Sequence, residues 1–288
     1  NPDSKWAYLW KGVMASDERD FEKAKTNFDE ALRIDPRFDM AHYNLGWAYL
    51  GSKPKNYVEA ERSFRKALSL NPDFKEAFYG LGMVFGYQSQ YSIAKQYLTK
   101  ALDLDDRFLT AWKWRGIVND ELELYDDALM DFSSAIAISP TNADIYMRRA
   151  RVGLKTEAFD SSLEDLLLAK KYDPKNARIF LYLGQLYAKL DQLEAATEAT
   201  LQALDLRAGY SDAYSLLSEV YLKQQKYADA IAALDNALEN TRYRRERFYV
   251  KRAAIHMATN EPKLALNDYI SAREDNPENA VAWLGEFK

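Results

Sequence analysis

Side chains that could act as acids, bases or metal ligands are few and scattered along this 288-residue chain. There is no cysteine, which excludes disulfides, thiolate metal sites and cysteine nucleophiles. The only two histidines, His42 and His256, stand where other parts of the sequence carry aromatic residues, so we expect both to be packing residues. A zinc site would need carboxylates and two distant histidines, which is a poor ligand set.

Carboxylates gather at Asp103–Asp106 and at Asp120–Asp127. Acid–base catalysis by paired carboxylates needs a shared cleft and pKa values that the surroundings push apart. A solvated surface explains these clusters better. The sequence also contains no glycine-rich phosphate loop, nucleophile elbow or kinase signature. We therefore predict no catalytic residues, no metal site and no cofactor.

The composition reduces the number of fold classes and partner classes that fit this chain. The net charge is -5, and an acidic chain lacks the basic surface that nucleic-acid binding requires. Glycine (11) and proline (8) are scarce, which disfavours an all-β fold with its many tight turns. No apolar run approaches the roughly 18 residues of a membrane helix, so we expect no direct membrane insertion by this segment. A soluble protein of the cytoplasm or the bacterial periplasm fits this composition.

Small residues recur along the whole chain at intervals of 34 to 36 residues. One series is Ala24, Ala60, Ala94, Ala128, Ser162, Ala196, Ala230, Ala265. A second series is Ala31, Ala67, Ala101, Ala135, Ala169, Ala203, Ala237, Ala272. A third series is Gly12, Gly46, Gly82, Gly116, Ala150, Gly184, Ser218, Ala253. Three series with one period predict a tandem array of structural repeats.

The period and the residue types resemble the tetratricopeptide repeat family. Its pattern is best matched by Leu45-Gly46 with Tyr49, by Leu81-Gly82 with Phe85, and by Leu183-Gly184 with Tyr187. The resemblance covers residues 1–288 as a single array of eight repeats: 5–38, 39–74, 75–108, 109–142, 143–176, 177–210, 211–245 and 246–279. It implies an all-α fold of antiparallel helix pairs coiled into a right-handed superhelix.

Simple packing arguments support that pattern. Gly or Ala where the two helices of a repeat cross would let their backbones approach closely, and nearby aromatic residues such as Phe28, Phe64 and Phe132 would fill the adjoining space. Proline after the second helix would stop it, as in Asp35-Pro36 and Asn71-Pro72. Residues 280–288 are expected to begin a further or capping helix. The chain is thus expected to be a segment of a longer protein, or to end in a truncated cap.

The family resemblance also implies where a ligand would lie. In such arrays the first helix of each repeat lines a concave groove, and its positions there are aromatic in repeats one to four and basic in repeats five to eight. We predict a peptide-binding groove lined by Tyr43, Asn44, Trp47, Tyr79, Met83, Trp114, Arg148, Arg151, Tyr182 and Gln185. Its ligand would carry an apolar segment and an acidic segment.

Two functions follow, and neither is catalytic for this chain. The leading one is a protein-interaction scaffold that binds a peptide or helix of a partner protein in the groove. The alternative is a recruiting or regulatory segment of a larger enzyme, or of a secretion or assembly protein, whose active part lies outside this chain. Many of the aromatic rings are also candidates for the core, and the basic residues are interleaved with Asp144, Asp212 and Glu219, which could simply pair with them.

Overall fold

The computed structural model describes residues 4–242 and 244–278. These residues form helices and turns without any strand, which confirms the all-α prediction. The further helix expected at residues 280–288 lies outside the described residues.

The helices follow one another in pairs, and we call the first helix of each repeat helix A and the second helix B. Every helix A has 13 residues and every helix B has 14. The bounds are α1 Lys5–Asp17, α2 Phe21–Ile34, α3 Asp39–Gly51, α4 Tyr57–Leu70, α5 Lys75–Tyr87, α6 Tyr91–Leu104, α7 Leu109–Glu121, α8 Tyr125–Ile138, α9 Ala143–Lys155, α10 Phe159–Tyr172, α11 Ala177–Lys189, α12 Leu193–Leu206, α13 Ser211–Lys223, α14 Tyr227–Asn240, α15 Glu246–Ala258 and α16 Pro262–Asp275.

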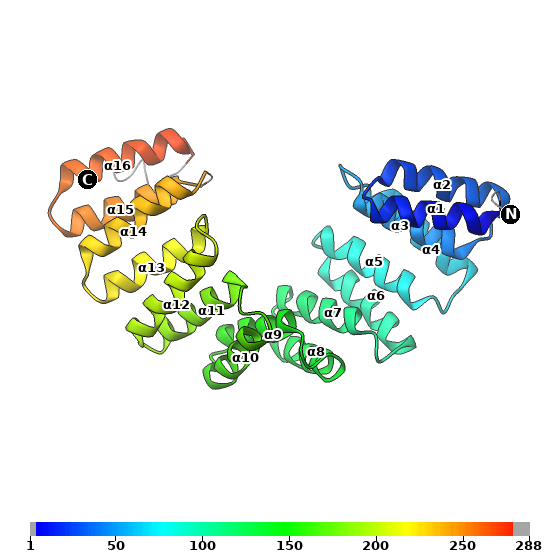
Figure 1. The fold of residues 1–288 in the computed structure, drawn as a ribbon, viewed down its shortest axis with the longest axis horizontal. Helices are drawn as coiled ribbons and strands as arrows, with labels where there is room; N and C mark the ends of the chain where they lie inside the picture. The colour runs from blue at the N-terminus through cyan, green and yellow to red at the C-terminus, as the bar shows by residue number, and fades with distance from the viewer. Residues whose placement is uncertain (1–3, 243, 279–288) are drawn as a thin grey trace. The chain divides into compact units, whose positions relative to one another are not determined.

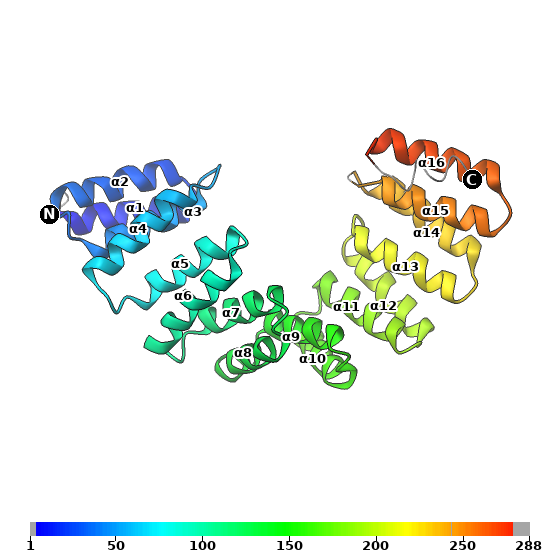
Figure 2. The ribbon, with the colours of Figure 1, turned by 180° about the vertical axis from the view of Figure 1, so that it is seen from behind.

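The chain divides into two compact units, Asn1–Thr141 and Asn142–Lys288. Unit 1 contains α1 to α8 and unit 2 contains α9 to α16. Within each unit, helices A and B of a repeat lie side by side and antiparallel, and successive pairs stack in chain order (Figures 1 and 2). That the two units form one continuous array remains a prediction.

The small residue of helix A sits against the large residue of helix B. A Cβ added to Gly12 would lie 2.4 Å from the Phe28 ring, and one added to Gly46 would lie 2.7 Å from the Phe64 ring. Both phenylalanines are fully buried. The absent side chain therefore provides the space that the ring fills, as the sequence predicts.

The turn from helix A to helix B has the same geometry in seven repeats. In each of them a backbone N–H bonds to the carbonyl five residues earlier, as from Leu124 to Asn119 at 2.9 Å, and this closes a Schellman motif. The residue before the donor has a positive φ although it is not glycine: Arg19, Ser89, Glu123, Glu157, Asp191, Gln225 and Asn260. This tight turn directs helix B back along helix A.

Candidate functional site

A row of aromatic rings runs along the A helices of unit 1, and we call it the aromatic ladder: Tyr43, Trp47, Tyr79, Tyr87 and Trp114. The ring centroids of Trp47 on α3 and Tyr79 on α5 are 5.8 Å apart. Those of Tyr87 on α5 and Trp114 on α7 are 5.9 Å apart in an edge-on arrangement. Because the rings come from successive A helices, the stacking of the repeats is what brings them together.

The ladder belongs partly to the core and partly to the surface. Tyr43, Trp47, Tyr79 and Trp114 are half-buried and pack against the buried cluster of repeats two and three, whereas Tyr87 is 41% exposed. Burial raises the pKa of the Tyr43 and Tyr79 hydroxyls. The half-buried rings therefore pack against the core of the repeats and leave part of their apolar surface exposed.

One donor in the ladder has no acceptor. The Trp47 indole N–H is buried and makes no hydrogen bond within the described part of the chain. The Trp47 N–H lies near the Tyr43 hydroxyl and partly offsets the rise that burial causes in the pKa of Tyr43. The two groups do not meet the geometry of a hydrogen bond. A buried donor without an acceptor costs about 1–3 kcal/mol.

Two residues predicted beside these rings have other environments. Met83 is 4% exposed and belongs to the buried cluster of repeats two and three, so its role as a groove residue stays a prediction. The helix that carries it, α5, contacts α3, α4, α6 and α7. Asn44 donates from Nδ2 to the carbonyl of Met40 at 2.8 Å, which is a bond within its own helix.

A groove of about 710 Å³ lies on the A helices of unit 2, and we call it the basic groove. It is lined by Arg151, Leu154, Lys155, Gln185, Ala188, Lys189, Asp212, Ser215, Leu216, Glu219, Val220, Lys223 and Arg247. The lining comes from α9, α11, α13 and α15, which are successive A helices. Of the predicted residues, Arg151 and Gln185 are part of it.

Positive charge dominates this lining, with five cationic and two anionic side chains. Asp212 pairs with Arg247 at 3.2 Å, and Glu219 pairs with Lys251 at 2.6 Å. The Lys223 ammonium donates to the Ala188 carbonyl at 3.0 Å, which uses one of its three donors. Both carboxylates thus have cationic partners from the next repeat, and the groove keeps an excess of positive charge over an apolar floor.

A smaller pocket of about 430 Å³ shares Gln185 and Asp212 with the basic groove. Its lining includes Arg178, the predicted Tyr182, and Tyr210, which the sequence analysis missed. Burial raises the pKa of Tyr210, and the nearby Arg178 opposes that rise. A signal for Tyr210 exists, because it occupies the position of Phe38, Phe74 and Phe108 just before helix A of other repeats.

Arg148 does not join the lining of either pocket. Its guanidinium pairs with Asp144 at 3.0 Å, one turn earlier on α9. The neighbouring Arg149 was not predicted as a notable residue, yet it forms a bidentate pair with Asp165 on α10, at 2.7 and 2.8 Å. These two arginines therefore serve contacts within their own repeat.

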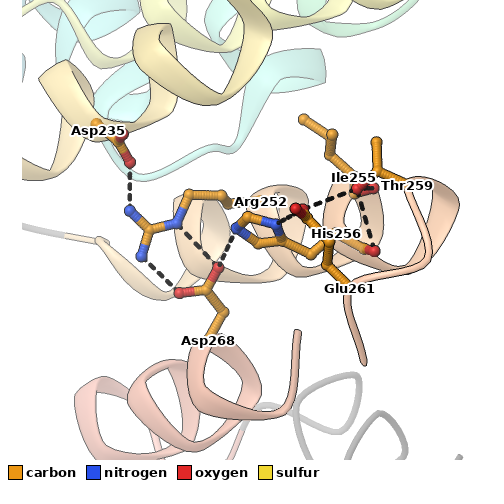
Figure 3. A network of polar contacts seen from close by, with 7 residues as sticks. All are labelled: Asp235, Arg252, Ile255, His256, Thr259, Glu261 and Asp268. Atoms are coloured by element: carbon orange, nitrogen blue, oxygen red, sulfur yellow. Dashed lines mark hydrogen bonds and ion pairs between the residues drawn. The ribbon is translucent and has the colours of Figure 1, made fainter. Parts of the chain in front are cut away.

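A polar network connects the last described helix pair (Figure 3). Arg252 on α15 bonds to Asp268 on α16 and to Asp235 on α14. His256 is 8% exposed, with its Nδ1 2.8 Å from Glu261 and its Nε2 3.8 Å from Asp268. This histidine is a packing residue, as expected, but its neighbours are carboxylates rather than a purely apolar core.

Neither catalytic nor metal-binding geometry emerges among residues 4–242 and 244–278. No group of three or more His, Asp or Glu side chains there is arranged to hold a metal ion. The expectation that the cluster Asp120–Asp127 is solvated is wrong for Asp120, which is 1% exposed. Its position in α7 corresponds to those of Leu50 and Leu154, which are also buried. None of the described helices has the length and apolar character to cross a membrane.

Comparison with known families agrees with the repeat pattern of the sequence and with the helix pairs of the structure. Two family models described as tetratricopeptide repeat match the chain, one at residues 11–73 and 79–143 and the other at residues 211–242. Together they cover more than half of the sequence. No curated protein matches the chain.

Solved structures share the fold at low sequence identity. A tetratricopeptide repeat protein from Parabacteroides merdae is 17% identical with a TM-score of 0.68, over 86% of this chain and 97% of that one. The pilF protein of Pseudomonas aeruginosa is 21% identical with a TM-score of 0.66, over 75% and 97%. YrrB, described as having an unusual peptide-binding site, is 23% identical with a TM-score of 0.55, over 65% and 95%.

Proposed function

Because the chain belongs to the tetratricopeptide repeat family, whose fold generally serves as a protein-interaction scaffold, we propose that it binds an acidic segment of a partner protein in the basic groove of unit 2. The observation that carries this proposal is the local excess of positive charge in a chain whose net charge is -5. The positive lining would attract an acidic segment, whose carboxylates can accept paired hydrogen bonds from arginine.

The shape of the groove suits an extended peptide rather than a small molecule. Its lining comes from four A helices, so charged side chains are spaced along it instead of converging on one point. Leu154, Leu216 and Val220 provide an apolar floor between the cations. A peptide that alternates acidic and apolar side chains would satisfy both features.

The aromatic ladder of unit 1 supports the second part of the predicted ligand, an apolar segment. Its half-buried rings offer flat apolar surface. These features are also compatible with packing alone, so the acidic segment is the primary proposal and the apolar segment is secondary.

The test is a fluorescence anisotropy titration of the full chain with a labelled ten-residue peptide of alternating Glu and Leu. Lys189→Glu/Lys223→Glu reverses two charges in the groove and should weaken binding by about tenfold or more, because like charges then face the ligand. Binding by the unmodified chain should also weaken as salt is raised from about 0.05 to 0.5 M.

The matched control is Lys171→Glu/Lys263→Glu, which makes the same change in net charge at exposed positions outside the groove. It should leave the affinity within about twofold, since surface charges beyond a Debye length are screened. Equal weakening by both pairs would mean that net charge, not the groove, attracts the peptide. No binding by the unmodified chain, or binding that ignores salt, would refute the proposal.

A further inference from the structure

Three cations gather at the two ends of the sixth repeat, in unit 2. Lys175 lies in the turn before α11, Arg178 is the second residue of α11, and Arg207 directly follows α12. The 430 Å³ pocket beside the basic groove is lined by Arg178, Arg207 and Tyr210 among others. A second pocket of about 430 Å³ is lined by the same three residues and by Lys175. We call Lys175, Arg178, Arg207 and Tyr210 the cationic corner.

Arg207 stands at a position that holds an oxygen acceptor in the other repeats. The residue directly after helix B is elsewhere an aspartate, an asparagine, a serine or a threonine: Asp35, Asn71, Asp105, Ser139, Asp173, Thr241 and Asn276. Asp35 accepts from the Lys5 ammonium at 2.6 Å, and Asp105 accepts from the Lys75 ammonium at 2.5 Å. The sixth repeat therefore has a cation where two other repeats have the anion of an ion pair.

The helix dipoles explain only part of this arrangement. The C-terminal end of α12 favours a cation, which suits Arg207. Lys175 and Arg178 flank the N-terminal end of α11, where a cation is unfavourable, and the first turn of α11 contains no acidic residue. The local fold therefore gives no reason for positive charge at these two positions, whereas an anionic ligand would.

Two guanidinium groups approach the same residue, Tyr210. That of Arg207 lies 4.8 Å from the centroid of the Tyr210 ring. Burial raises the pKa of the Tyr210 hydroxyl, and the charge of Arg178 lies close enough to oppose this rise. Tyr210 is only 9% exposed, so its position is set by the packing of the repeat. The two arginines, which come from the two ends of the repeat, thus meet at one fixed side chain.

The chain's own carboxylates leave these charges uncompensated. Among the residues that the structure describes, no carboxylate forms an ion pair with any of the three cations of the corner. Asp212 lines the first pocket, but it pairs with Arg247 at 3.2 Å. Asp173 lines the second pocket, where the Asn176 amide donates to it at 2.9 Å. The two pockets therefore keep an excess of positive charge.

We propose that the cationic corner binds the phosphate of a phosphorylated serine or threonine next to the acidic segment in the basic groove. This inference rests on the function proposed above and adds the modification that the site recognises. At pH 7 such a phosphate carries about -1.5 to -2 charges and three acceptor oxygens, so it can accept from both arginines and from the lysine. A carboxylate has two oxygens, and a phosphodiester carries one charge, so each would satisfy fewer of these donors.

The corner is continuous with the basic groove, which favours a phosphate that is part of the peptide. Gln185 and Asp212 line both the groove and the first pocket. A phosphorylated residue beside a segment in the groove would therefore need no long linker, and tethering would raise its effective concentration at the corner. A free phosphate ion lacks this advantage, and the three exposed cations would hold it weakly.

The test is a fluorescence anisotropy titration of the full chain with the labelled peptide of alternating Glu and Leu. One version is extended by Gly-Gly-Ser at its carboxyl end and another by Ser-Gly-Gly at its amino end, so that both directions in the groove are covered. Each is compared with its phosphoserine form. One of the two phosphorylated peptides should bind about tenfold more tightly than its unphosphorylated form. Glutamate in place of phosphoserine should gain about threefold at most.

Substitutions in the corner test the source of this gain. Arg178→Ala/Arg207→Ala should remove the gain and leave the affinity for the unphosphorylated peptide within about threefold. Arg178→Lys/Arg207→Lys keeps both charges but loses the paired donors, so it should retain a gain of only about threefold. The matched control Lys171→Ala/Lys263→Ala removes the same charge at exposed positions outside both pockets and should keep the full gain.

Lys189→Glu/Lys223→Glu separates this inference from the function on which it rests. It should weaken the binding of both forms of the peptide and keep their ratio. If the unphosphorylated peptide does not bind, the function proposed above fails. Binding of the phosphorylated peptide that Arg178→Ala/Arg207→Ala abolishes would still support the corner.

Four results would overturn the inference. They are a gain below about twofold for both phosphorylated peptides or no binding by either, a gain that survives Arg178→Ala/Arg207→Ala, and an equal loss of the gain in the control pair. The fourth is reversal of the gain by millimolar inorganic phosphate, because the corner would then bind the free ion as well as the peptide.

Discussion

Three arginines replace the leucine that precedes the small residue of helix A in other repeats. Arg115, Arg149 and Arg252 each pair with an aspartate sixteen residues later on helix B, at 2.7, 2.7 and 2.5 Å. The aspartates Asp131, Asp165 and Asp268 are at most 4% exposed. Burial raises the pKa of the Asp131 carboxyl, and Arg115 opposes that rise. Two of the repeats with leucine at the first position carry alanine at the second, Leu183 with Ala199 and Leu217 with Ala233. The second position therefore holds an aspartate only where the first holds an arginine.

His42, also at the scale of single residues, leads to a prediction of how stability depends on pH. Burial lowers the pKa of its imidazole, and the Pro36 carbonyl only partly offsets this effect. Between the lowered pKa of the folded state and the unfolded value of about 6.5, the unfolded chain binds a proton that folded His42 does not. Stability contributed by the neutral imidazole is therefore complete above this window and is lost as pH falls through it.

We expect His42→Phe, which installs the residue that Phe78 provides in the next repeat, to reduce the loss of stability between pH 7 and pH 5. Urea denaturation at both pH values measures the difference, and His256 remains in both proteins as a common background. An unchanged pH dependence after the substitution would show that His42 does not titrate in this window.

At the scale of the helices, the contact between the small residue and the large residue sets the distance between helices A and B. The combinations differ among repeats: Gly116 faces Phe132, whereas Ala150 occupies the place of Gly116 in a repeat whose helix B has Leu166. A Cβ on Gly116 would lie 2.8 Å from the Phe132 ring, which is closer than side chains tolerate without displacement.

The effect of Gly116→Ala on stability should therefore change sign with the residue at position 132. Gly116→Ala should gain about 1 kcal/mol from helix propensity but lose about 1–3 kcal/mol from overpacking, so it should destabilise the chain by roughly 1 kcal/mol. In a Phe132→Leu background the clash is relieved, and the same substitution should become stabilising. A double-mutant cycle by urea denaturation measures both effects. Stabilisation by Gly116→Ala alone would contradict the proposed contact.

At the scale of the whole molecule, stability depends on contacts between helices that are close to one another along the chain. Within each unit, each helix contacts the helices next to it along the chain, and successive A helices such as α3 and α5 also contact one another. Repeat proteins of this kind behave as a sum of repeat stabilities and interface terms, and they can open locally without global unfolding. A single free energy of unfolding therefore describes them poorly.

The Arg252 network tests this organisation (Figure 3). Arg252→Leu would leave Asp268 buried without its cation, which costs about 3–5 kcal/mol. Amide hydrogen exchange should accelerate in α14 to α16 while the helices of unit 1 keep their protection. Adding Asp268→Ala recreates the combination of Leu183 with Ala199 and should restore much of the protection. Uniform acceleration throughout the chain would instead indicate one cooperative unit.

The sequence alone was sufficient for the helix pairs and their repeat, because the contacts within a repeat are local. Gly12 meets Phe28 and Gly46 meets Phe64 for the same steric reason, so the spacing of small residues recurs with the structure. The charge difference between the A helices of the two units was likewise readable from residue types, and Arg151 and Gln185 do line the basic groove.

Tertiary structure decided which of these side chains remain accessible. Met83 and Met14 are the same residue type on A helices, yet one is 4% and the other 62% exposed. Among the described helices, α5 contacts α3, α4, α6 and α7, whereas α1 contacts α2 and α3. Arg148 and Arg149 are adjacent in sequence, but one pairs along its own helix and the other reaches a buried aspartate across to the next. Residue type and spacing specify what a side chain can do, whereas burial depends on neighbours that are distant in sequence.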